Sequence, residues 1–227
     1  MNIFDIIGPV MTGPSSTHTA GAARLGGIAG KLLGQPVLRA DIFLFESFAA
    51  TGKGHGTDKA IVGGILGMAP DDARLSDSFG HAEQANLAYT VTFSSGRREH
   101  PNTAEMRLSG ESRSIDVAGV SLGGGRVEIT RINGLDVSIC ADYPTLVVFS
   151  QDRSGTVAHI TQMLAATRIN IASMLFFRDQ EGENAVMTIE LDQEIPAALL
   201  AVLKQVEYVS EVIYLRPIGA CIGEAAQ

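Results

Sequence analysis

The segment from Gly13 to Thr19 combines a histidine, His18, with four hydroxyl residues at a predicted helix start. Free backbone N–H groups and the helix dipole attract an anion at such a position. Hydroxyl groups beside them would clamp a carboxylate. The competing interpretation is helix capping, which needs only one hydroxyl residue.

A second segment, Gly52 to Asp58, places three alternating glycines around His55. The glycines expose the backbone and keep bulky neighbours away from the imidazole, whose pKa near neutrality suits a general base or proton shuttle. The competing interpretation is a strand-to-helix turn capped by Thr57 or Asp58. A dinucleotide motif would need a third glycine at position 57, so the segment does not predict a nucleotide site.

Two further polar segments predict no function by themselves. Glu99 to Thr103 contains His100 and Asn102 and predicts a solvated turn before a strand. Ser121 to Gly125 predicts a hairpin turn, with a place in the wall of a site as the alternative.

Helices and strands of the first part of the chain are expected to position these segments. A helix is predicted from Ser16 toward Leu33, and its glycines imply close packing against another element. A strand is predicted at 40–48, a glycine-rich loop at 52–57, a helix at 59–68 and an acidic helix within 72–87. Further strands are predicted at 89–93, 104–108, 114–120, 126–131 and 135–140.

The second part of the chain has clearer periodicity. Strands are predicted at 146–149, 169–177, 186–191 and 208–215, with a turn at 179–182 and helices from Val157 and from Pro196. Ser154 is the predicted N-cap of the first helix. The order βαββαβ predicts a ferredoxin-like sandwich of helices on an antiparallel sheet. The fold class is therefore α+β, with an N-terminal α/β domain before the ferredoxin-like domain.

Composition limits the classes of function. The chain has 227 residues, 45% hydrophobic residues and two cysteines, Cys140 and Cys221. Two cysteines exclude a disulfide framework and a self-contained cysteine-ligated metal site, and they suit a reducing cytoplasm. The net charge of −8 without a basic cluster argues against binding of nucleic acid or membrane. Neither a signal peptide nor a membrane-spanning segment is expected.

The distribution of glycine predicts two domains. Residues 1–140 hold 21 of the 25 glycines. The predicted domains are residues 1–141 and 142–217, followed by a C-terminal tail at 218–227.

Three motifs, taken in order, resemble the beta subunit of iron–sulfur-dependent L-serine dehydratase. They are Phe-Asp-Ile-Ile-Gly-Pro at 4–9 and the segments 13–19 and 52–58; segments 100–103 and 121–125 follow in the expected order. The resemblance extends to about Arg216 and departs at Thr17, where the family has a third serine. The second domain resembles an ACT domain. The first is similar to the allosteric substrate-binding domain of phosphoglycerate dehydrogenases.

This resemblance implies a specific reaction. L-serine loses water across its Cα–Cβ bond to give an aminoacrylate, which becomes an imine and is hydrolysed to pyruvate and ammonia. The family also implies a 4Fe–4S cluster that binds the serine hydroxyl as a Lewis acid, with its cysteine ligands on a separate alpha subunit. Cys140 and Cys221 are then expected not to be ligands.

The resemblance also assigns roles to residues of this chain. His55 is the first candidate for proton transfer, and His18 is the second or orients the substrate. Ser15, Ser16 and Thr19, with backbone N–H groups, would hold the carboxylate of the substrate. His100 and Asn102 would complete the pocket, and Thr57 and Asp58 would support the His55 loop.

The ACT-like domain has two alternative roles. It would bind an effector such as L-serine at Ser154, Gly155 and Asn170, or it would serve only for self-association. For the whole chain, the alternative to an enzyme subunit is a non-catalytic amino-acid-binding regulatory protein. The histidine-containing clusters favour the enzyme, because a sensor needs no proton shuttle.

Overall fold

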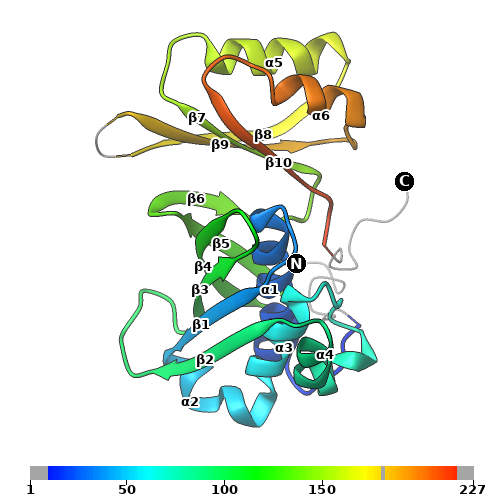
Figure 1. Cartoon of the computed structure of the whole chain (residues 1–227), viewed down its shortest axis with the longest axis vertical. Helices are drawn as coiled ribbons and strands as arrows, with labels where there is room; N and C mark the ends of the chain where they lie inside the picture. The colour runs from blue at the N-terminus through cyan, green and yellow to red at the C-terminus, as the bar shows by residue number, and fades with distance from the viewer. Residues whose placement is uncertain (1–9, 180–181, 219–227) are drawn as a thin grey trace, which may run out of the picture. The chain divides into compact units, whose positions relative to one another are not determined.

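The computed structural model describes residues 10–179 and 182–218. These residues form two compact units, one running to Asn133 and the other from Gly134 to Pro217 (Figure 1). The motif at 4–9, residues 180–181 of the predicted turn, Cys221 and residues 219–227 of the tail lie outside the described residues. No helix in the described part is long and apolar enough to cross a membrane.

A six-stranded mixed sheet forms the frame of the first unit, and its last strand falls in the range of the second unit, just after the boundary at Gly134. Its strands are β1 (Arg39–Phe45), β2 (Ala88–Ser94), β3 (Thr103–Ser109), β4 (Ser114–Gly123), β5 (Arg126–Ile132) and β6 (Leu135–Ile139), in the order β2-β1-β3-β4-β5-β6. β1 and β2 run parallel, whereas β1–β3, β3–β4 and β4–β5 are antiparallel. A parallel pair requires a crossover connection. That connection contains α2 (Glu46–His55), α3 (Thr57–Ile65), a short 3₁₀ helix (Ala73–Asp77) and α4 (Ser78–Gln84).

Two helices of the first unit approach each other at the level of their backbones. A π-helical segment, η2 (Ser16–Gly21), continues into α1 (Ala22–Leu33), which packs against α3 and against β3 and β4. A Cβ atom at Gly26 would lie 2.2 Å from the carbonyl oxygen of Ile61, and one at Gly64 would lie 2.0 Å from that of Ala23. This contact confirms the prediction that the helix glycines serve close packing.

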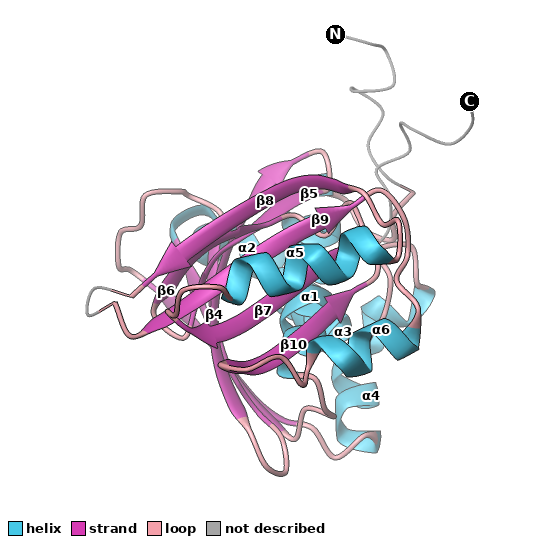
Figure 2. Cartoon of the chain, turned by 90° about the horizontal axis from the view of Figure 1, so that it is seen from above, coloured by secondary structure: helices cyan, strands magenta, loops and turns pink. Residues whose placement is uncertain are grey.

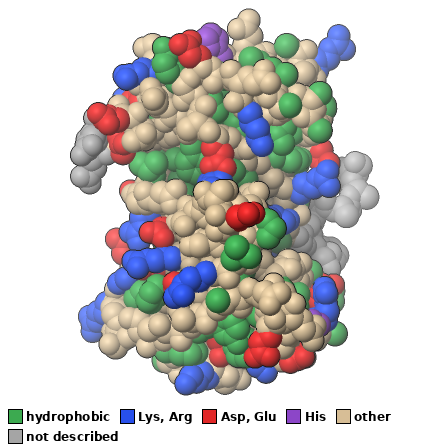
Figure 3. All heavy atoms as spheres, in the orientation of Figure 1, with side chains coloured by type: hydrophobic (Ala, Val, Ile, Leu, Met, Phe, Trp, Pro, Cys, Tyr) green, Lys and Arg blue, Asp and Glu red, His purple; other side chains and the backbone are tan. Residues whose placement is uncertain are grey.

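The outward face of the sheet carries paired charges. Arg39 contacts Asp41 at 2.9 Å, and Arg98 contacts Glu105 at 2.8 Å. Figure 3 shows basic and acidic side chains interspersed on the visible face rather than gathered by sign. Such exposed pairs contribute little to stability.

The second unit has the predicted βαββαβ order. Its elements are β7 (Thr145–Gln151), α5 (Thr156–Ala166), β8 (Ile171–Arg178), β9 (Asn184–Leu191), α6 (Ala197–Leu203) and β10 (Val209–Leu215). The antiparallel sheet has the order β10-β7-β9-β8, and α5 and α6 lie side by side on one face of it (Figure 2). Leu146, Ile160 and Met187 are fully buried between the layers. The ferredoxin-like prediction is confirmed.

Three local predictions were wrong. The segment 52–57 is not a loop, because Gly52 to His55 complete α2 and only Gly56, at φ +67°, breaks the helix before α3 begins at Thr57. The strand predicted at 40–48 therefore ends at Phe45. Ser154 is not the cap of α5, since Gly155 occupies that position with no side-chain cap hydrogen bond.

Candidate functional site

The first histidine lies at the start of the long N-terminal helix. Ser15 has extended backbone angles and caps η2, because its Oγ accepts the backbone N–H of His18 at 3.0 Å. The capping interpretation therefore holds for Ser15. The backbone N–H groups of Ser16 and Thr17 have no hydrogen-bond partner within the described residues. They remain free for an external acceptor, and π-helical turns of this kind are frequent at functional sites.

The hydrogen bonds of the His18 ring determine its tautomer. Its Nε2 lies 3.0 Å from Thr51 Oγ1 and 3.2 Å from Ser47 Oγ. The Thr51 hydroxyl donates its proton to the Ser47 carbonyl at 2.9 Å, so it can only accept from His18. We therefore assign the proton to Nε2 of His18. Its Nδ1 then faces Ser15 Oγ at 3.4 Å.

His55 has the opposite tautomer. Its Nδ1 lies 3.0 Å from the Thr51 carbonyl, which can only accept, so Nδ1 carries the proton. Its Nε2 therefore presents a lone pair, with no hydrogen-bond partner within the described residues. The two imidazole rings lie 4.9 Å apart between centroids. A half-buried histidine with a free Nε2 is suited to accept a proton from a ligand.

Burial of the ring lowers the pKa of His18 below 6.5, and the charge of His55 lowers it further, while a hydrogen bond with Ser47 opposes the change. His18 is consequently neutral at pH 7, in agreement with its assigned tautomer. The pair therefore combines a neutral ring, His18, with a ring whose Nε2 has no hydrogen-bond partner among the described residues.

The lowered pKa of His18 has a consequence for stability. The unfolded chain takes up a proton at this residue near pH 6.5, whereas the folded chain does so only at lower pH. The free energy of unfolding should therefore fall as the pH drops below about 6.5. We expect His18→Gln to show a smaller loss of thermal stability than the wild type between about pH 7.5 and pH 5.5. Parallel melting curves over that range would contradict this.

The third polar segment joins the same site. The Pro101 carbonyl accepts the backbone N–H of Ser47 at 2.9 Å, so the 99–103 segment contacts the first turn of α2. His100 Nδ1 accepts the backbone N–H of Asn102 at 3.2 Å. Asn102 donates from Nδ2 to the carbonyl of Ser121 at 3.3 Å, and Ser121 Oγ donates to the Thr17 carbonyl at 3.0 Å. The segments at 13–19, 52–58, 100–103 and 121–125 are therefore connected by hydrogen bonds.

Two buried polar atoms of this group lack hydrogen-bond partners among the described residues. They are Oδ1 of Asn102 and the hydroxyl oxygen of Thr57, a residue with no exposed surface. Thr57 begins α3, and Asp58 accepts the backbone N–H of Lys59 at 2.9 Å. Both residues form the helix start directly behind His55.

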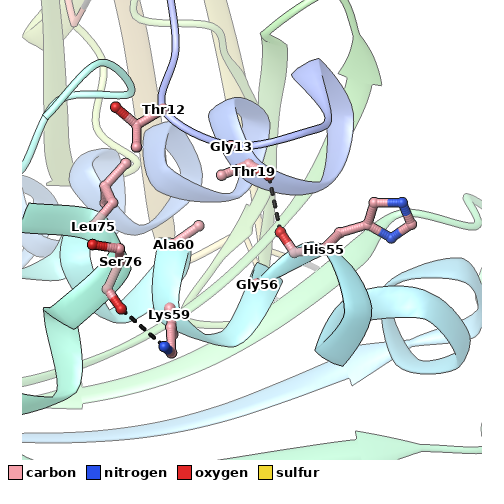
Figure 4. Close-up of a pocket in the computed structure, with 9 residues that line it drawn as sticks. All are labelled: Thr12, Gly13, Thr19, His55, Gly56, Lys59, Ala60, Leu75 and Ser76. Carbon is pink, nitrogen blue, oxygen red and sulfur yellow. Dashed lines mark hydrogen bonds between the residues drawn. The ribbon is translucent and has the colours of Figure 1, made fainter. Parts of the chain in front are cut away.

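A small cavity of about 110 Å³ lies behind this helix start. Figure 4 shows Thr12, Thr19, Lys59 and Ser76 around it, with the His55 ring pointing away from them. Thr19 is buried, and its hydroxyl donates to the His55 carbonyl at 3.0 Å. Lys59 Nζ donates to the Ser76 carbonyl at 2.8 Å. The cavity thus touches the backbone of His55 and not its reactive nitrogen.

Sequence analysis missed two polar side chains of α2. Ser47 and Thr51 precede His55 by eight and four residues, so all three share one face of α2. The helical spacing of these residues could not be recognised because a loop was predicted at 52–57. A hydroxyl pair at i and i+4 before a histidine is the signal that would have revealed them.

The predicted residues of the second unit lie around the start of α5 and β8. Ser154 and Gly155 are exposed, and Gly155 has φ +95°. Asn170 is exposed and donates from its side chain to the carboxylate of Asp192. The hydroxyls of Ser150 and Thr156, at the β7–α5 connection, are buried and have no hydrogen-bond partner in the part of the chain that the structure describes.

The comparisons with known proteins decide the family. A family model described as "Serine dehydratase beta chain" matches residues 2–108, and an ACT domain model matches residues 144–208. The chain is 40% identical to the "Probable L-serine dehydratase, beta chain" of Bacillus subtilis (strain 168), covering 93% of this chain and 96% of that one. It belongs to the serine dehydratase beta-chain family.

A second beta chain agrees with this assignment, and a dehydrogenase shows a more distant similarity. The "L-serine dehydratase, beta chain" of Peptoniphilus asaccharolyticus is 35% identical, with 90% of this chain and 93% of that one covered. A D-3-phosphoglycerate dehydrogenase of Synechocystis is 22% identical over 82% of this chain and 34% of its own length. The expected α+β class, the C-terminal ACT domain and the likeness to phosphoglycerate dehydrogenases are thereby confirmed.

Proposed function

We propose that this chain is the beta subunit of an L-serine ammonia-lyase that converts L-serine to pyruvate and ammonia. The observation that carries the proposal is the free Nε2 lone pair of His55 beside the start of η2. Elimination of water requires removal of the weakly acidic Cα proton, for which a positioned base is needed. In this family member, the hydrogen bond from Nδ1 to Thr51 leaves Nε2 available for that role.

The other residues of the site would hold the substrate. In our proposal Ser15, Ser16 and the free N–H groups of η2 bind its carboxylate, and Thr19 fixes the His55 segment through the His55 carbonyl. His18 stays neutral and orients the substrate. His100 and Asn102 complete the pocket, while Thr57 and Asp58 support the helix start behind His55.

The described residues offer no ligand set for the 4Fe–4S cluster that the family resemblance implies. Among residues 10–179 and 182–218, no group of three or more His, Cys, Asp or Glu side chains could hold a metal ion. We therefore propose that a 4Fe–4S cluster is held by a separate alpha subunit. The part of the reaction assigned to this chain is substrate binding and proton transfer at His55 Nε2.

The test is co-expression with a cysteine-bearing alpha chain under anaerobic conditions, followed by an assay of pyruvate formed from L-serine. The assembled pair should produce pyruvate, and this chain alone should not. Pyruvate from this chain alone would contradict a two-subunit enzyme. No pyruvate from a pair with an intact cluster would favour the alternative, a non-catalytic amino-acid-binding regulatory protein.

A second candidate function is effector binding by the ACT domain. Buried hydroxyls without partners are costly, and those of Ser150 and Thr156 lie next to the uncapped N-terminus of α5. We propose that L-serine binds there, close to Ser154, Gly155 and Asn170.

The exposed apolar residues Met174 and Leu175 on the edge strand β8 support self-association of the domain, which sedimentation of the full chain would measure.

Replacing Thr156 by valine tests the effector site. The substitution removes the unpartnered hydroxyl at nearly constant shape, so the free chain should be at least as stable as the wild type. L-serine binding to the ACT domain should weaken, as measured by calorimetry on the full chain and on a His18→Gln background. Unchanged serine affinity in Thr156→Val would count against this site.

A further inference from the structure

Glu46 has an unusual backbone conformation at the entrance to α2. Its φ is +44°, in the left-handed region that side chains other than glycine rarely adopt. It is the first residue of α2 and directly precedes Ser47, whose hydroxyl contacts His18. A strained residue that persists beside a site is a reason to ask what its side chain does there.

The carboxylate of Glu46 holds a neighbouring loop. Its Oε1 accepts the backbone N–H of Arg98 at 2.8 Å. The Arg98 guanidinium lies 3.8 Å from the ring centre of Phe45, the residue before Glu46, and its Nε contacts Glu105 at 2.8 Å. The loop at 95–102 is thereby attached to the β1–α2 junction at Arg98.

The same loop is attached a second time near its end. The Pro101 carbonyl accepts the backbone N–H of Ser47 at 2.9 Å. Both attachments therefore come from adjacent residues, Glu46 and Ser47. Between and beside them lie His100, whose Nδ1 accepts the backbone N–H of Asn102, and Asn102, whose side chain donates to the Ser121 carbonyl.

Stability does not account for this arrangement. The ion pair of Arg98 with Glu105 is partly exposed, and such pairs contribute little. Glycine would adopt the Glu46 backbone angle without strain. The strained residue supplies what glycine cannot, an acceptor for the Arg98 N–H.

We propose that Glu46 is a positioning residue: its carboxylate fixes the 95–102 loop so that His100 and Asn102 complete the substrate pocket beside His18. Glu46 acts through the loop and does not touch the substrate. The inference rests on the proposed function, because the pocket it completes is the one assigned to L-serine.

Glu46→Gly separates stability from activity. The variant should unfold at the same or a higher temperature than the wild type, because the backbone strain is relieved. In the assembled two-subunit enzyme, kcat/KM for L-serine should fall about tenfold or more, mainly through KM, because a displaced loop misplaces the substrate. The pH profile of kcat should not change. Glu46→Gln keeps the acceptor oxygen, so the loop should stay attached at Arg98 and the activity should be close to that of the wild type.

Amide hydrogen exchange of this chain provides a readout independent of turnover. Protection of the Arg98 amide should be lost in Glu46→Gly and kept in Glu46→Gln. Asn86→Gly is the matched control, because Asn86 also has positive φ, +55°, but lies outside the site and should leave exchange in the loop and kcat/KM unchanged.

Three results would overturn the proposal. They are full activity in Glu46→Gly, a loss of its activity that follows a lowered melting temperature, and a failure of Glu46→Gln to keep activity. If the wild-type pair makes no pyruvate, the proposed function fails instead. The exchange measurement then still decides whether Glu46 fixes the loop.

Discussion

Replacement of His55 by alanine should lower kcat of the assembled enzyme for L-serine by roughly 10²–10⁴-fold, the usual contribution of a positioned general base. His55 is the residue of the site whose Nε2 presents an unpartnered lone pair, because its Nδ1 donates to the Thr51 carbonyl. His18 is less suited to this role, since its Nε2 carries the proton and the lone pair on its Nδ1 faces Ser15 Oγ at 3.4 Å. Pyruvate formation at saturating L-serine measures the effect.

The control for this variant is His159→Ala. His159 lies exposed on α5 and should leave kcat unchanged. The cluster absorbance and the melting temperature of each assembled variant separate loss of the base from loss of assembly. Near-normal turnover of His55→Ala with an intact cluster would remove His55 as the base.

Gly26→Ala should prevent stable folding of the first unit. The added methyl group would lie 2.2 Å from the Ile61 carbonyl oxygen and 3.0 Å from the Ile65 nitrogen. Both are backbone atoms of α3, so relief requires α1 and α3 to separate. Overpacking in a core costs roughly 1–3 kcal/mol and occasionally more. Urea unfolding of the full chain, or loss of soluble protein, measures the effect.

The adjacent glycine is the matched control. A Cβ atom at Gly27 would lie 3.6 Å from the Gly64 carbonyl oxygen, an ordinary contact. Gly27→Ala should therefore leave the packing intact and stabilise the helix by about 0.5–1 kcal/mol. Equal effects of the two substitutions would contradict the backbone contact between α1 and α3.

In the second unit, the order of helices and strands could be predicted from the sequence. The apolar spacing of its helices and strands is clear, and local propensity agrees with the observed βαββαβ order. In the first unit, the helix starting near Ser16 and its close packing were also predictable. Several glycines in one helix have few explanations other than contact with another backbone.

The prediction of a loop at 52–57 was wrong for a physical reason. Glycine weakens an isolated helix by about 1 kcal/mol per residue, so Gly52 and Gly54 favoured a loop. Tertiary contacts reverse that preference. Phe48 is fully buried, and a Cβ atom at Gly52 would lie 3.3 Å from side-chain atoms of Phe93 and Thr57, so the helix is closely packed at this position. The hydroxyls of Ser47 and Thr51 came into the site only through this helix.

The sequence by itself determined the family of this protein, the order of its second domain and the types of residue in its site. Those features depend on motif, composition and local periodicity, which are properties of the sequence itself. The tertiary structure decided which segments meet and which imidazole nitrogen is free. His18 and His55 differ in tautomer because of their hydrogen bonds to Thr51, a residue close to His55 in sequence and distant from His18. A tautomer depends on donors and acceptors in space, and only the fold brings those together.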